Sequence, residues 1–351
     1  MTTVGIIANP MSGRDIRRLV ARASVFPNAE KTSMILRLAA AAGALGVQRL
    51  LLSTDTFGIA AGVLRADRHR VGRQDPCWPR LEFCDLEPPT STAADTRALV
   101  RQMRAHGAGL IVLLGGDGTV RAAAAELGDT PVLPLSTGTN NAFPQMWEAT
   151  VAGVAAALVA TGAVDAGVAT RRAKVLHVQC GHREELALVD VCVSTVGYVG
   201  ARALWQTAAL RELYCAFAEP HAIGLSSIAA QLRPTARDSL RGVAVRLAGD
   251  DPAPRSVLAP IAPGTLAHVG VLDVSDMAFH ERWVSQVPAG TVAVDGEREI
   301  EFGRHEQVSV TLSDRGPLVV DVPAVLRAAA ERRLLATESA LPTPVPRVAM
   351  R

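Results

Sequence analysis

Lysine is almost missing from this 351-residue chain: it has only Lys31 and Lys174, so nearly all of its 36 basic residues are arginines. Neither lysine is close in sequence to the glycine-rich loop described below, and the phosphate-binding pattern G-x-x-x-x-G-K-[ST] is absent. Acidic residues nearly balance the basic ones, which leaves a formal net charge of +2. A chain this close to neutral gives no electrostatic reason to expect a nucleic-acid or membrane partner.

Signals for metal binding and secretion are also lacking. The five cysteines are odd in number and follow no zinc-ligand spacing, and no histidines show the His-x-x-x-His or His-Glu-x-x-His pattern. No secretory leader follows Met1, so we expect reduced thiols and a cytoplasmic location. The longest uncharged stretch, Ala149 to Val164, is short for a membrane span and predicts a buried helix.

The chain has enough apolar sequence for two domains, since 49% of its residues are hydrophobic and 20% are charged. In residues 1–165, strand-like and helix-like segments alternate. This predicts a doubly wound, Rossmann-like α/β domain with ligand sites at the carboxyl ends of parallel strands. Strands are predicted at 4–8, 48–52, 81–84, 110–114 and 132–135, and helices around 16–20, 31–45, 57–66 and 92–105. Residues 68–80 are expected to form an irregular surface loop.

The second half differs in character. From residue 166 to 322, short β-like segments separated by turn residues predict a mostly β domain, with a sandwich as one arrangement. The predicted strands are 175–180, 186–194, 242–248, 265–274, 290–294 and 307–312. A final amphipathic helix within residues 323–336 is expected to pack back on the first domain. The proline-containing tail, 337–351, is expected to be loosely ordered.

One segment combines three glycines and a single carboxylate at the end of an apolar run. Leu110–Leu114 predicts a buried strand, Gly115-Gly116-Asp117-Gly118-Thr119 follows it, and residues 122–127 predict a helix. Glycines let backbone N–H groups approach an anion, and a helix N-terminus favours negative charge. A carboxylate there would repel phosphate unless it binds Mg²⁺ or takes a proton from a substrate hydroxyl. The segment therefore indicates phosphoryl transfer, with a ligand-free tight turn as the alternative.

Three further polar turns are candidates for the same crevice. They are Asn9-Pro10-Met11-Ser12-Gly13 after the first strand, Ser136-Thr137-Gly138-Thr139-Asn140-Asn141 after the strand 132–135, and Asp295-Gly296-Glu297 in the second half. Hydroxyls and amides of the second turn can hydrogen-bond to ribose, base or phosphate. Each turn also has a structural explanation, because Asp-Gly between strands, for example, is a common hairpin signal.

Taken in order, these four motifs resemble those of the superfamily of NAD kinases, diacylglycerol kinases and sphingosine kinases. Residues 259–266 are similar to the stretch that precedes the Asp-Gly turn of NAD kinases. Residues 13–18, 199–204 and 223–228 resemble the NAD kinase-like family of acetoin-catabolism protein X. The resemblance implies an NAD kinase-like fold, ATP-dependent phosphoryl transfer to a hydroxyl of a small molecule, a link to acetoin catabolism, and a homodimer or homotetramer.

The resemblance also implies roles for individual residues. Asp117 would activate the acceptor hydroxyl or hold Mg²⁺, which would enter with ATP rather than occupy a site made of protein side chains alone. Residues at the nucleotide would be Asn9, Ser12, Gly115, Gly116, Gly118, Thr119, Thr137, Gly138, Thr139 and Asn140. Residues at the substrate or cleft would be Asn141, Asp190, Asp295 and Glu297. Without a lysine at the loop, the triphosphate would depend on backbone amides, Mg²⁺ and an arginine such as Arg121.

Two departures from the NAD kinase pattern leave the acceptor open. The Asn-Glu pair with which NAD kinases bind ribose and base has its nearest counterpart in residues 188–191, where only the acid Asp190 is kept. The glycine-rich run that follows the pair is replaced by residues 194–200. A non-catalytic nucleotide-binding regulator or sensor is the main alternative to a kinase. A nicotinamide-dependent oxidoreductase is disfavoured by the acid inside the glycine loop.

Overall fold

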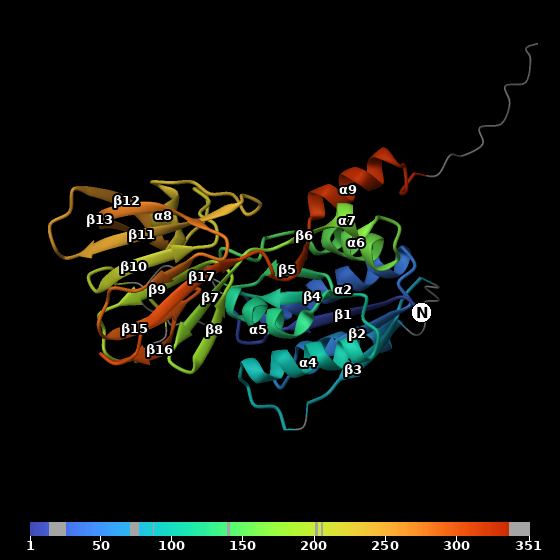
Figure 1. Ribbon diagram of the computed structural model, residues 1–351. Coiled ribbons are helices and arrows are strands. Elements are labelled where there is room, and N and C mark those ends of the chain that lie inside the picture. Colours follow the sequence, from blue (N-terminus) through green and yellow to red (C-terminus); the bar gives the residue numbers. More distant parts are fainter. Residues whose placement is uncertain are drawn as a thin grey trace, which may run out of the picture.

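The computed structural model describes residues 1–13, 26–70, 77–86, 88–138, 141–200, 203–204 and 206–336. These residues form an α/β domain built on one sheet and a β domain built on two, which lie side by side (Figure 1). Three expectations fall wholly or partly outside the described residues: the helix around 16–20, the middle of the loop 68–80 and the tail 337–351.

The α/β domain is built on a seven-stranded sheet in the order β3-β2-β1-β4-β5-β18-β6. Its strands are β1 (Thr3–Ala8), β2 (Arg49–Ser53), β3 (Arg80–Cys84), β4 (Leu110–Gly115), β5 (Val132–Ser136), β6 (Thr170–Arg172) and β18 (Leu318–Val320). The strands pair in parallel from β3 to β18, and β6 pairs antiparallel with β18. The sheet thus draws its last two strands from the segment expected to be purely the β domain.

Helices cover both faces of this sheet, which confirms the predicted doubly wound fold. They are α2 (Asn28–Ala44), α3 (Ile59–Arg70), α4 (Ala93–Ala105), α5 (Asp117–Leu127), α6 (Ala149–Ala160), α7 (Ala166–Ala169) and α9 (Val322–Glu331). Apolar residues of α2, α3, α6 and α9 share one core cluster with the sheet, and those of α4 and α5 share another. The helix α9 begins at the capping carboxylate of Asp321 and lies against α6 and α7 (Figure 1).

The β domain contains two antiparallel sheets, ordered β12-β13-β11-β10-β9-β15-β16 and β14-β17-β7-β8. Its elements are β7 (Val175–Cys180), β8 (Arg183–Ala187), β9 (Asp190–Ser194), β10 (Leu210–Cys215), α8 (Ser226–Ala230), β11 (Arg241–Gly249), β12 (Arg255–Ala262), β13 (Thr265–Ala278), β14 (Arg282–Val284), β15 (Gly290–Val294), β16 (Glu297–Phe302) and β17 (Val308–Ser313). Buried residues of β9 and β15 share a core cluster with those of β7 and β17, as in a sandwich.

The predicted single strand 186–194 is wrong, because two strands of different sheets occupy it. β8 ends at Ala187 in the four-stranded sheet, and β9 begins at Asp190 in the seven-stranded sheet. Between them, the amides of Leu188 and Val189 donate to the Asp295 carboxylate, at 3.0 and 2.8 Å from Oδ1. These amides are diverted from sheet pairing, so the chain turns from one sheet to the other.

The uncharged stretch 149–164 contains the helix α6, which packs on α2, as expected of a buried helix. Of the helices that the structure describes, none is long and apolar enough to cross a membrane. The packing of α6 on α2 is close at Gly153: a Cβ there would lie 2.8 Å from Ala41 Cβ and 3.0 Å from the Leu38 carbonyl oxygen. These distances are shorter than van der Waals contact, so the two helices need glycine at this crossing.

Replacing Gly153 by valine is therefore expected to lower the free energy of unfolding by about 2 kcal/mol, because overpacking forces α2 and α6 apart. Urea unfolding followed by circular dichroism measures this loss. Gly303→Val is the matched control, since a Cβ at Gly303 meets no described atom within 4 Å. Equal stability of the two variants would contradict the close helix crossing.

Candidate functional site

A cleft with a volume of about 1530 Å³ lies between the two domains. Its α/β wall consists of segments that follow β1, β2, β3, β4 and β5, at the carboxyl ends of these parallel strands. Its opposite wall consists of β8 and the β15–β16 turn of the β domain, together with His177 of β7. Crevices outside the carboxyl ends of parallel strands are the usual ligand sites of doubly wound sheets.

The glycine loop joins β4 to α5 at this cleft. Gly115 ends β4, Gly116 is the N-cap of α5 in an extended conformation, and Asp117 is the first residue of the helix. Gly118 lines the cleft, and a Cβ at Gly118 would meet no described atom within 4 Å. A ligand can therefore approach the backbone at the start of α5, where amides have no acceptor within the helix and carry partial positive charge.

Asp117 lies half-buried between the loop and the segment after Gly138. Its carboxylate accepts hydrogen bonds from the amides of Phe143, at 2.8 Å, and Ala142, at 3.1 Å. Burial, followed by the nearby charge of Asp295, raises the pKa of Asp117 to about 7, against the smaller opposing effects of the two amides and Arg237. A carboxyl group with this pKa exchanges a proton near neutral pH, as a general base requires.

Two glycines enclose the side chain of Asn141. A Cβ at Gly116 would lie 2.7 Å from Asn141 Oδ1, and a Cβ at Gly138 would lie 2.6 Å from the same amide group. The Asn141 Nδ2 atom donates to Ser136 Oγ at 2.8 Å. Asn141 thus holds the two glycine-containing turns together at the edge of the cleft. Thr139 and Asn140 lie outside the described residues.

The turn after β1 is hydrogen-bonded to both of these loops. Asn9 Nδ2 donates to Thr119 Oγ1, and Ser12 Oγ shares a hydrogen bond with Thr137 Oγ1, each at 2.8 Å. Asn9, Ser12 and Thr119 line the cleft. Thr137 is fully buried, and its hydroxyl stabilises the turn after β1 from inside the domain. The expectation that Thr137 lines the crevice is therefore wrong.

Lys31 lies closer to the site in space than its distance in sequence suggests. Its buried ammonium donates to the carbonyl oxygens of Asn9, at 2.8 Å, and Ser12, at 3.0 Å. Lys31 therefore stabilises the turn after β1. No local pattern predicts this contact, because Lys31 lies on α2, outside any motif, and its side chain extends back to the preceding turn.

Arg121 links the two domains through carboxylates. From α5 it contacts Glu299 Oε1 at 2.7 Å, Glu185 Oε2 at 3.7 Å and Asp295 Oδ2 at 3.8 Å, all on the β domain. These acids neutralise the arginine that we expected to hold the triphosphate. Asp295 belongs to a hairpin turn, as the Asp-Gly pattern predicts, with a left-handed φ of 49°. The carboxylate of Asp295 also fixes the β8–β9 bend.

The other two cleft candidates differ in position. Glu297 lines the main cleft, where β16 begins. Asp190 is 4% exposed and faces a separate small cavity of about 10 Å³, which Asp117 and Asp295 also line. This cavity has room for about one water molecule and is too small for part of a substrate. Asp190 therefore lies apart from the main cleft, so its expected place at the substrate is not supported by its position.

Two residues at the site escaped the sequence analysis. His177 lines the cleft from β7, and the alternation of buried and exposed residues along that strand could have placed it on the outer face. Arg237 binds the carbonyls of the segment whose amides bind Asp117, but it belongs to no motif and lies far from that segment in sequence.

Among the described residues, no cluster of three or more His, Cys, Asp or Glu could hold a metal ion. A Mg²⁺ ion would accordingly need oxygens from the nucleotide.

Comparisons with known proteins find matches over both domains of this chain. The model of the ATP-NAD kinase N-terminal domain matches residues 4–164, and that of the acetoin catabolism protein X C-terminal domain matches residues 174–315. Acetoin catabolism protein X of Cupriavidus necator is 40% identical over 337 residues, which cover 95% of this chain and 93% of that protein. A candidate diacylglycerol kinase of Bacillus anthracis str. Sterne aligns with a TM-score of 0.42 and 11% identity, over 91% of this chain and 97% of that chain.

Proposed function

This chain belongs to the NAD kinase-like family of acetoin catabolism protein X, and from that premise we propose that it transfers the γ-phosphoryl group of ATP to a hydroxyl of a small molecule. The observation that carries the proposal is Asp117, a half-buried carboxyl with a pKa of about 7 at the start of α5, facing an interdomain cleft. Phosphoryl transfer to a hydroxyl requires a proton acceptor beside the anion site, and nucleotide binding alone does not.

The described residues fit a bound nucleotide. The backbone at Gly116 and Gly118 is open to the cleft at a helix N-terminus, which favours phosphate oxygens. Asn9, Ser12 and Thr119 place neutral hydrogen-bonding groups beside it. Mg²⁺ bound to the phosphates would neutralise part of their charge, which leaves the Asp117 carboxylate for proton transfer.

In this proposal the protein contributes alignment, charge and proton transfer. The amides at the start of α5 hold the phosphoryl group, and Asp117 accepts the proton of the acceptor hydroxyl as its oxygen attacks phosphorus. The wall of β8 and the β15–β16 turn, with Glu184 and Glu297, would face the acceptor.

A pH dependence follows from the raised pKa of Asp117. The carboxylate form accepts the proton, so kcat/KM is expected to fall about tenfold per pH unit below about 7 and to be level above it, within the stable range of the protein. Initial rates between pH 5 and 9 measure this profile. A level profile down to pH 5 would contradict the role of Asp117 as the base.

A non-catalytic nucleotide sensor is the second candidate, and the neutralised Arg121 favours it, because no unpaired arginine from α5 is left to stabilise a transition state. The test is ADP release from Mg-ATP in the presence of NAD, NADH, acetoin, butanediol, glycerol or diacylglycerol. The proposal expects release that depends on one acceptor. Calorimetric binding of ATP without release on any acceptor would favour the sensor.

A further inference from the structure

The loop between α8 and β11 reaches from the β domain to the segment that binds Asp117. Its Arg237 donates from Nη1 to the Phe143 carbonyl oxygen at 2.8 Å and from Nη2 to the Ala142 carbonyl oxygen. The same guanidinium contacts Glu219 Oε2 at 3.1 Å and lies 4.4 Å from the centre of the Phe217 ring. Arg237 is therefore held on three sides, by backbone carbonyls, a carboxylate and an aromatic face.

The contacts of Arg237 and Asp117 meet on a single peptide unit. The Ala142 carbonyl, which accepts from Arg237, and the Phe143 amide, which donates to Asp117 Oδ1 at 2.8 Å, belong to one planar group. Fixing the oxygen of a planar peptide fixes the direction of its N–H. A cation at the oxygen also polarises the group and strengthens the hydrogen bond that the N–H donates. Arg237 thus acts on Asp117 through the peptide between Ala142 and Phe143.

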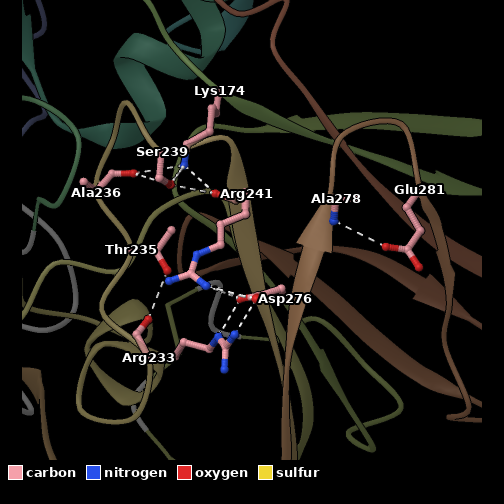
Figure 2. Close-up of polar contacts among 9 residues, drawn as sticks. All are labelled: Lys174, Arg233, Thr235, Ala236, Ser239, Arg241, Asp276, Ala278 and Glu281. Atoms are coloured by element: carbon pink, nitrogen blue, oxygen red, sulfur yellow. Dashed lines mark hydrogen bonds and ion pairs between the residues drawn. The ribbon is translucent and has the colours of Figure 1, made fainter.

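The loop that carries Arg237 is anchored on both sides of this residue (Figure 2). Arg233 before it and Arg241 after it both bind the Asp276 carboxylate of β13. Lys174 donates from its ammonium to the Ala236 carbonyl at 3.0 Å, to Ser239 Oγ at 2.9 Å and to the Arg241 carbonyl at 2.6 Å. The base of the loop is therefore rigid, and a rigid support is what a positioning side chain needs.

Lys174 connects this anchor to the junction of the domains. It precedes β7, next to Ala173, whose amide and carbonyl pair with Pro317 and Gly316 of the returning chain, at 2.9 and 3.0 Å. The two segments that connect the domains, around residues 173 and 317, are thus hydrogen-bonded to each other next to Lys174, which binds the loop. Any change in how the domains dock would move the loop and Arg237 relative to the α/β domain.

We propose that Arg237 is a positioning residue for the catalytic Asp117, supplied by the β domain through the Ala142–Phe143 peptide, so that the site is complete only when the two domains are docked. The inference rests on the proposed function, because it assigns Asp117 its role. Its structural part, the control of Asp117 by Arg237, can be tested without turnover.

The direct test follows the Asp117 carboxyl carbon by NMR titration of aspartate-labelled protein, with its signal identified by its loss in Asp117→Asn. The other charged groups around Asp117, namely Asp295 of the β15–β16 turn, Asp190 of β9 and Arg121 of α5, are unchanged in the variants below. Removing the cation in Arg237→Gln is expected to move the Asp117 titration to higher pH. An unchanged titration in folded Arg237→Gln would overturn the inference.

The kinetic test separates positioning from a general loss of structure. In Arg237→Gln, kcat is expected to fall about 100-fold while KM changes little. The acid limb of the pH profile is expected to move to higher pH. Arg237→Lys keeps the charge but lacks the planar guanidinium that binds both carbonyls and Glu219 in one fixed arrangement, so it restores the position of the acid limb and only part of kcat. Arg237→Lys also serves if the glutamine variant fails to fold: an acid limb and kcat both equal to those of wild type would then refute the positioning role.

Arg211→Gln is the matched control, because it removes an arginine of the β domain that also donates to a backbone carbonyl, that of Ala208 at 2.8 Å, and touches neither this loop nor residues 142–143. Its kcat and acid limb are expected to stay at wild-type values. Equal effects of Arg211→Gln and Arg237→Gln would assign the result to the loss of any β-domain arginine and overturn the specific role of Arg237. If wild type turns over no acceptor while the NMR shift occurs, the proposed function fails and the coupling of Arg237 to Asp117 stands.

Discussion

Replacing Asp117 by asparagine is expected to lower kcat for phosphoryl transfer by about 10³-fold. Asparagine has nearly the same shape and can still accept one hydrogen bond from the amides of Ala142 and Phe143, but it cannot accept a proton. The loss is expected in kcat, while calorimetry should find ATP affinity within about threefold of wild type, because the amides of α5 remain. Initial-rate kinetics with the identified acceptor measures the effect.

The control is Asp129→Asn, which removes an 87%-exposed carboxylate that pairs with Arg172 far from the cleft. This variant is expected to keep wild-type kinetics, since an exposed ion pair contributes little. Circular dichroism and thermal unfolding establish that both variants are folded. A kcat of Asp117→Asn within tenfold of wild type would refute Asp117 as the base.

Replacing Arg121 by methionine is expected to lower the free energy of unfolding by about 3 kcal/mol. The Arg121 side chain is 14% exposed, and its partners Asp295 and Glu299 are 1% and 15% exposed. Methionine fills a similar volume but leaves these carboxylates buried without their cation. Because the partners lie on the other domain, part of the loss should appear as weakened domain docking, with a broadened unfolding transition. Guanidinium unfolding followed by fluorescence and circular dichroism measures both.

Arg101→Met is the matched control on the neighbouring helix α4. Arg101 pairs with Glu126 at 2.7 Å, but its side chain is 56% exposed, so its loss is expected to cost less than about 1 kcal/mol. The contrast between the two arginines isolates the effect of burial. If Arg121→Met were no more destabilising than Arg101→Met, the ion pairs between the domains would not stabilise the docked arrangement.

The strands, turns and helix starts that could be predicted from sequence are those that depend on residues close together in the chain. The apolar run at 110–114 followed by three glycines predicts a buried strand, a turn and a helix, and the structure has β4, Gly116 and α5 there. Thr92 was expected to begin a helix, and its hydroxyl accepts from the Ala94 amide at the start of α4. Such features depend on residues only a few positions apart, so a single sequence contains them.

The features that escaped prediction depend on pairs distant in sequence. The Asp295 carboxylate bends the chain at Leu188, and no pattern near residue 188 shows where that acid will lie. Lys31 and Arg237 likewise reach the site through backbone carbonyls, which accept hydrogen bonds whatever the residue type. The amino-acid composition of the accepting segment therefore does not indicate that such a contact will form.

The central claim is that the cleft moves phosphate from ATP to an alcohol, and the most direct measurement is phosphorus NMR of the protein with Mg-ATP and a mixture of candidate alcohols. We predict loss of the γ-phosphate signal with equal growth of ADP and of one phosphomonoester signal, and none of these changes in Asp117→Asn. Growth of inorganic phosphate alone would show hydrolysis, and saturating ATP binding with no change in any signal across wider mixtures would show a sensor. Either result would contradict the account.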